Sequence, residues 1–232
     1  MEKSIQVMKE QLSGIDFYKR FPIMIPFIGD HYLSNQHKKM LLVGESFYFP
    51  EKSEIHKNAD IWYNASQEDL GVVIEEGKPA KEKEWINCDG LLRSDWKSSG
   101  HQIYININAA IREKIPHYHK RPIDEIAYTN FFVRPAIKGQ MFKNYKKNGS
   151  ITVDIKYANM ILETVIGILN PDLLVFVSKD AFDMANIQQL KNNPNLDVEF
   201  VCHPADPFHW GVKTYKHNRD KFLRILEEKF LI

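Results

Sequence analysis

Cysteine and long apolar runs are scarce in this sequence. Only two cysteines, Cys88 and Cys202, occur among 232 residues, too few for a disulfide framework or an all-cysteine metal cluster. No apolar run is long enough to cross a bilayer. The first residues show neither the apolar core nor the cleavage site of a signal peptide. We therefore expect a cytoplasmic protein that has no membrane partner.

An excess of charge of one sign is also lacking. Lysine and arginine total 31 and aspartate and glutamate total 30, which gives a formal net charge of +1. Without a global positive field, any binding of nucleic acid must use a local basic patch. The histidine spacing typical of metal sites is absent as well. We therefore expect no metal and no other cofactor.

Alternating apolar and amphipathic segments predict an α/β fold. Hydrophobic residues make up 44% of the chain, enough for a sizeable core, and neither a repeat nor a linker divides residues 1–232. We expect one domain, a monomer, with three α/β/α layers around a mostly parallel sheet of four strands. The expected strands are 40–44, 126–131, 173–177 and 198–202, and the main expected helices are 103–114, 154–169, 181–189 and 218–230.

The stretch from residue 40 to residue 50 organises this interpretation. Its apolar run ends at Gly44, where glycine permits a sharp turn, and Glu45 and Ser46 follow. Open α/β sheets bind ligands just beyond the carboxyl ends of their strands. Three aromatic residues come next, namely Phe47, Tyr48 and Phe49.

Two later strand ends carry similar polar and aromatic residues. Thr129, Asn130 and Phe131 lie in a β-rich run before Arg134-Pro135, and His203-Pro204 ends the last expected strand. In a parallel sheet these ends lie on one side, so we expect one pocket to receive Gly44, Glu45, Ser46, Tyr48, Asn130 and His203, with at least one of Phe47, Phe49 and Phe131 on its wall.

Together, and in this order, these segments resemble the uracil-DNA glycosylase superfamily. That family has a strand ending in Gly-Gln-Asp-Pro-Tyr, a later Thr-Asn often followed by Arg-Pro, a strand ending in His-Pro-Ser-Pro, and a last helix. The resemblance covers residues 38–230. It implies a base-flipping architecture whose partner is DNA or a free nucleobase or nucleoside.

The resemblance also implies roles for individual residues. Asn130 matches the asparagine that hydrogen-bonds uracil, and an amide offers both a donor and an acceptor. His203 matches the histidine that stabilises negative charge on the leaving base. A flipped base would stack on Phe47, Phe49 or Phe131, beside Tyr48.

The loop after His203 matches the family's DNA-inserting loop. Phe208 is the expected apolar wedge and Trp210 the second choice, with Lys213 among the lysines that would hold phosphates. The alternative is that Phe208 and Trp210 are buried and anchor the loop.

Departures from the family pattern leave other functions open. Ser46 stands where the family has an aspartate, and a neutral serine cannot stabilise a positive sugar as a carboxylate can, although Glu45 is adjacent. A non-catalytic nucleobase or nucleic-acid binding module is therefore one alternative. Another is an SGNH-type serine esterase that uses Ser46, Asp206 and His209.

Overall fold

The structure is a computed structural model, and it describes residues 4–96, 101–115, 121–137, 151–206, 210 and 217–232. A five-stranded sheet lies at its centre, in the order β1-β5-β2-β6-β7. All neighbouring pairs are parallel except β1 with β5. The mostly parallel α/β sheet is thus confirmed, but it has five strands rather than four. The strands are β1 (Phe27–Ile28), β2 (Met40–Phe49), β5 (Ala127–Ile137), β6 (Leu173–Phe176) and β7 (Asp197–Phe200).

The two central strands are longer than the sequence predicts. β2 does not stop at Gly44 but continues to Phe49, and β5 continues through Pro135 to Ile137. They pair from Leu41 opposite Ala127 to Phe49 opposite Ile137, and the register shifts once, between Ser46 and Tyr48. The expected turn at Gly44 is therefore wrong, because pairing with β5 keeps the backbone extended there.

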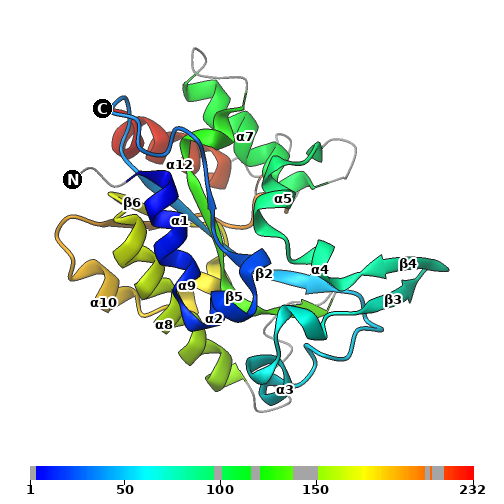
Figure 1. Cartoon of the computed structure of the whole chain (residues 1–232). Helices are drawn as coiled ribbons and strands as arrows, with labels where there is room; N and C mark the ends of the chain where they lie inside the picture. Colours follow the sequence, from blue (N-terminus) through cyan, green and yellow to red (C-terminus); the bar gives the residue numbers. More distant parts are fainter. Residues whose placement is uncertain (1–3, 97–100, 116–120, 138–150, 207–209, 211–216) are drawn as a thin grey trace.

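Helices cover both faces of the sheet (Figure 1). On one face, Tyr104 of α7 packs edge-on against Tyr128 of β5, with ring centroids 5.5 Å apart. On the other face, the Tyr18 hydroxyl of α2 lies beside Thr129, the next residue of the strand. Consecutive strand residues point to opposite faces, so these contacts place helices on both sides. The bounds are α1 (Ile5–Ser13), α2 (Asp16–Arg20), α3 (Ala59–Asn64), α4 (Glu82–Trp85), α5 (Cys88–Arg93), α7 (Gln102–Lys114), α8 (Ile151–Leu169), α9 (Lys179–Met184), α10 (Ile187–Lys191) and α12 (His217–Ile225).

The helix expected over 181–189 is divided into α9 and α10. Ala185 is extended, with ψ near 155°, and ends α9. Ser178 begins α9 as its N-cap, because the Ser178 hydroxyl accepts a hydrogen bond from the Ala181 amide. The other long helices lie close to their expected positions. None of the helices in the described ranges has both the length and the apolarity needed to cross a bilayer.

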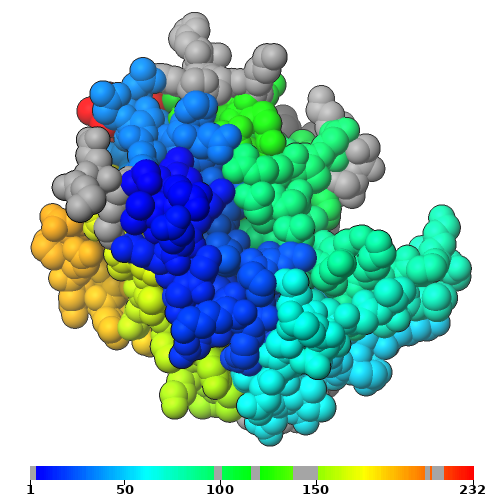
Figure 2. All heavy atoms as spheres, in the orientation of Figure 1, coloured from blue at the N-terminus to red at the C-terminus, as the bar shows by residue number. Residues whose placement is uncertain are grey.

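A two-stranded hairpin in the middle of the chain was not predicted. β3 (Val72–Glu75) and β4 (Lys78–Lys81) pair with each other and project from the body of the molecule (Figure 2). The buried carboxylate of Glu82 fixes the base of the hairpin, since it accepts hydrogen bonds from the Ser53 hydroxyl and the Gly71 amide.

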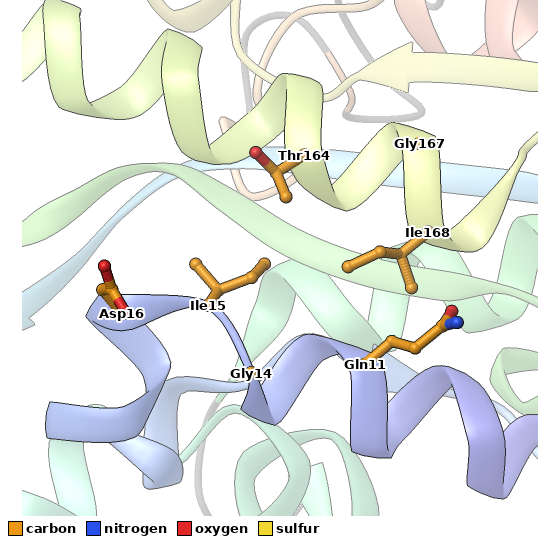
Figure 3. A pocket seen from close by; sticks show the side chains of 7 residues that line it. All are labelled: Gln11, Gly14, Ile15, Asp16, Thr164, Gly167 and Ile168. Carbon is orange, nitrogen blue, oxygen red and sulfur yellow. The ribbon is translucent and has the colours of Figure 1, made fainter.

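A shallow groove lies between α1 and α8 (Figure 3). It is lined by Gln11, Gly14, Ile15, Asp16, Thr164, Gly167 and Ile168. The last turns of α8 lead directly into the amino end of β6, so this groove lies away from the carboxyl ends of the strands. It is therefore separate from the residues that the sequence selects.

Candidate functional site

The strand order places a topological switch point between β2 and β6. The chain passes from β2 to β5 on one side and then crosses to β6 on the other. Open α/β sheets bind ligands beyond the carboxyl ends of the strands at such a point. β6 stops opposite Val43, so Gly44 and Glu45 lie just beyond it.

Glu45 is held at this point by Ser178. The Ser178 hydroxyl donates a hydrogen bond of 3.0 Å to the Glu45 carboxylate, and only 8% of Glu45 is exposed. The same hydroxyl caps α9, so it links this helix to β2. Glu45 therefore has a fixed position beside the helix N-terminus, where negative charge is favourable.

Gly44 is required here for close approach of side chains, not for a turn. A Cβ at this position would lie 2.1 Å from the Tyr128 hydroxyl oxygen and 2.3 Å from Asn130 Oδ1. The Tyr128 hydroxyl donates to Asn130 Oδ1 over 3.1 Å. Within the described residues the Asn130 Nδ2 group makes no hydrogen bond. The amide is thus oriented by its oxygen and keeps a donor for another partner.

His203 follows β7 in a tight turn. Its Nδ1 accepts a hydrogen bond of 3.2 Å from the Ala205 amide, which places the proton of the neutral ring on Nε2. Burial lowers the pKa of His203, and the nearby Asp206 carboxylate opposes that shift. His203 is therefore a neutral imidazole near pH 7, with one N–H group to donate.

Helix α7 contacts both the Asn130 side and the His203 side of the sheet. Tyr104 packs against Tyr128, and two residues later the Asn106 amide donates to the Pro204 carbonyl over 2.6 Å. β5 and β7 are separated by two strands, and α7 bridges the two positions. Asn130 and the His203 turn therefore lie toward the same face of the sheet.

The predicted residues do not all share that face. Gly44 and Asn130 are register partners, as are Ser46 and Phe132, so these residues point to one side. Glu45 alternates to the other side. The reason is the length of β2 and β5, which makes these positions strand residues with alternating directions instead of loop residues.

Most of the aromatic candidates are core residues. Phe49 is fully buried, edge-on against His56 and Trp62, with ring centroids 5.1 and 6.0 Å away. Phe131 and Phe47 are also buried, at 1% and 6% exposed. A base could stack on these rings only if the core repacked. Tyr48 is partly exposed, and burial raises its pKa to about 12, so its phenol stays protonated.

Trp210 is an anchor in this structure. It is 4% exposed, its ring lies 5.6 Å from that of Phe222, and its amide donates to the Asp206 carbonyl. This placement favours the anchoring alternative for Trp210 over the wedge. Phe208, His209 and Lys213 lie outside the described residues, so their expected roles stay predictions.

The esterase alternative gains no support from Ser46. Its hydroxyl is buried near the Tyr48 phenol but makes no hydrogen bond of ordinary geometry within the described part of the chain. A nucleophilic serine needs a histidine base within hydrogen-bond reach. The proposed base, His209, is one of the residues that the structure does not describe.

Three residues of this site were missed at the level of sequence. Tyr128 lies two residues before Asn130, a spacing that puts both on one face of a strand. Ser178 directly follows an expected strand, which is the same kind of position that the sequence predicts for Glu45. Asn106 gave no signal, because its partner Pro204 is 98 residues away. Across the described ranges, no three His, Cys, Asp or Glu side chains are placed to share a metal ion.

Replacing Gly44 with alanine tests the packing of this site. The added methyl group would clash with Tyr128 and Asn130, so we expect a loss of about 1–3 kcal/mol in the free energy of unfolding. Gly167→Ala is the matched control, since a Cβ there meets no atom of the described residues within 4 Å, and should be neutral or stabilising. Urea unfolding of both variants gives the comparison. Equal losses would show that Gly44 is not needed for close approach.

Comparison with known proteins gives this chain no family assignment: no protein-family model matches the sequence, and neither does any curated protein.

Proposed function

We propose that this protein binds a nucleobase on the face of the sheet that carries Asn130, and hydrolyses the N-glycosidic bond of that base as a uracil-DNA glycosylase-like enzyme. One observation carries the proposal. The Asn130 amide is oriented by Tyr128 and lies beside the backbone of Gly44. Helix α7, which packs against Tyr128, is also hydrogen-bonded to the turn that contains the neutral His203.

The chemistry of Asn130 suits recognition of a base edge. Its Nδ2 group can donate to a base carbonyl, while Oδ1 has a second lone pair that can accept from a base N–H. The hydrogen bond that the Tyr128 hydroxyl donates to Oδ1 fixes the orientation of the amide. A preset orientation lowers the entropic cost of ordering the side chain when a base binds.

His203 would act on the leaving base. As the N-glycosidic bond breaks, negative charge develops on the base, and a preorganised N–H donor stabilises that charge. The hydrogen bond from Ala205 keeps Nε2–H as the donor, and the lowered pKa keeps the ring neutral. A neutral donor can stabilise the anion without first protonating the base.

The support for a carboxylate that stabilises the positive sugar is weaker. Ser46 supplies no charge, and Glu45 points to the other face, where it accepts from Ser178. To stabilise a positive sugar, the Glu45 side chain would have to give up its hydrogen bond to Ser178 and turn toward the face that carries Asn130. The same observation favours the second candidate, a module that binds a nucleobase or nucleic acid without turnover.

A glycosylase assay on uracil, hypoxanthine and xanthine in single- and double-stranded DNA tests the proposal, with a generic ester in parallel. We expect release of a free base. Removal of one preorganised donor costs on the order of 100-fold in rate, so Asn130→Asp and His203→Ala should each show such a loss. Asn64→Asp, at an exposed position on α3, is the control and should keep the full rate.

The outcomes separate the candidates. Binding of the same DNA or base without release of product would favour the module, provided that Asn130→Asp weakens the binding. Ester cleavage that Ser46→Ala abolishes would favour the esterase. Neither binding nor cleavage of any of these substrates would overturn the proposal.

A further inference from the structure

The hairpin of β3 and β4 is closed by a tight turn of two residues. Its two loop residues, Glu76 and Gly77, both have positive φ, 50° and 78°, as in a type I′ turn. Among the described residues neither strand pairs with any other strand. An isolated two-stranded hairpin is only marginally stable in water, so a further strand would stabilise it.

The two edges of this hairpin differ. Glu75 and Lys78 are the register partners that flank the two-residue turn, and in such a hairpin this pair exchanges both backbone hydrogen bonds. The pattern alternates, so the next pair, Ile74 with Pro79, directs its backbone groups outward, as does Val72 with Lys81. On β4 the outward position at Pro79 lacks an N–H group, and proline on an edge blocks pairing.

The edge of β3 carries no such protection. Neither Val72 nor Ile74 makes a further backbone hydrogen bond in the part of the chain that the structure describes. Their side chains are 59% and 50% exposed, unusual values for large apolar residues. An exposed edge with β-branched side chains is a template for strand addition.

We infer that a second copy of this chain adds to this edge, so that two β3 strands pair antiparallel about a twofold axis through Val73. The hydrogen-bonding pattern of β3 is self-complementary in this register. The outward backbone N–H and C=O groups of Val72 in one copy hydrogen-bond to those of Ile74 in the other. The twofold axis repeats this pair between Ile74 of the first copy and Val72 of the second.

Side chains support the same register. Val73 and Ala80 are cross-strand partners on one face of the hairpin, and pairing would extend them into a continuous apolar row across both copies. On the opposite face, Ile74 would lie against Val72 of the second copy. Glu75 would oppose Gly71, so no like charges meet. The product is a four-stranded sheet whose outer edges are both blocked by Pro79.

A cysteine scan tests the register. In the proposed pair the two Val73 residues face each other without hydrogen bonds, at the Cα separation of about 4.5 Å that a disulfide tolerates. In a Cys202→Ser background with oxidised glutathione, Val73→Cys should form a covalent dimer at least roughly tenfold faster than Val72→Cys or Ile74→Cys, which do not face their own copies. These two positions are matched controls, because both are more exposed than Val73. Equal rates would overturn the proposal.

Sedimentation equilibrium of the wild-type chain, over micromolar to sub-millimolar concentrations, tests the association itself. We expect a reversible dimer. Ile74→Pro removes one outward donor from each copy but none of the hairpin's own hydrogen bonds, and should raise the dimer Kd by roughly tenfold or more. A wild-type chain that stays monomeric throughout, or an Ile74→Pro variant that dimerises equally well, would overturn the inference.

Discussion

Replacing Asp154 with alanine is expected to lower the free energy of unfolding by about 3–5 kcal/mol, because it leaves a buried arginine without its carboxylate. The side chains of Arg134 and Asp154 are both 0% exposed. Arg134 donates through Nε to Asp154 Oδ1 over 2.8 Å and through Nη2 to Oδ2. The Tyr63 hydroxyl donates to the same carboxylate over 2.8 Å. This cluster joins α3, β5 and α8.

Urea unfolding at pH 7 measures this effect. Asp16→Ala is the control, because Asp16 forms an ion pair of similar length with Lys19 on the exposed surface, where such pairs contribute little. Arg134→Met combined with Asp154→Leu should cost less than the sum of the single changes, since neither charge remains buried. If Asp154→Ala and Asp16→Ala were equally mild, the buried pair would not stabilise the fold as argued.

Acidification is expected to destabilise the protein through His56. This histidine is fully buried, and within the described residues neither ring nitrogen has a hydrogen-bond partner. Its pKa is lowered to about 4, by burial first and then by the Arg134 and Lys57 charges. Its pKa in the unfolded chain is about 6.5. Between these values the unfolded state binds more protons than the folded state. Stability therefore falls as the pH falls from about 6.5 to about 4.

The expected loss between pH 7.5 and pH 4.5 from this one group is about 2–3 kcal/mol. His56→Met, which fills similar space and does not titrate, should have a pH dependence weaker by that amount. The difference between wild type and variant isolates His56 from His203, whose lowered pKa acts in the same direction in both proteins. Parallel pH profiles for the two proteins would contradict the assignment.

The fold class could be predicted from local pattern because periodicity is a local property. The amphipathic spacing of residues 154–169 identified α8, which the structure places at Ile151–Leu169. Short apolar runs located β6 and β7 within one or two residues. The antiparallel strand β1 has only two residues, too few for any periodic signal to emerge.

The composition of the candidate site was partly predictable. Polar residues after apolar runs selected Glu45 and His203, and the Thr-Asn motif selected Asn130. Their relative directions were not predictable, because residues expected beyond the strand ends are strand residues, whose side chains alternate between the two faces of the sheet. The position of Phe131 in the core likewise depends on an aromatic partner far along the chain, Phe176 of β6.

The sequence by itself determined that this chain forms alternating helices and strands around a mostly parallel sheet, since apolar spacing and turn residues act between near neighbours. Only the tertiary structure decided how far β2 and β5 extend, because each is kept extended by hydrogen bonds to the other, more than 80 residues away. It also decided that Gly44 serves close packing, that Glu45 and Asn130 face opposite sides, and that Arg134 is buried. A charge can be buried only where folding supplies its partner, and no local pattern contains that partner.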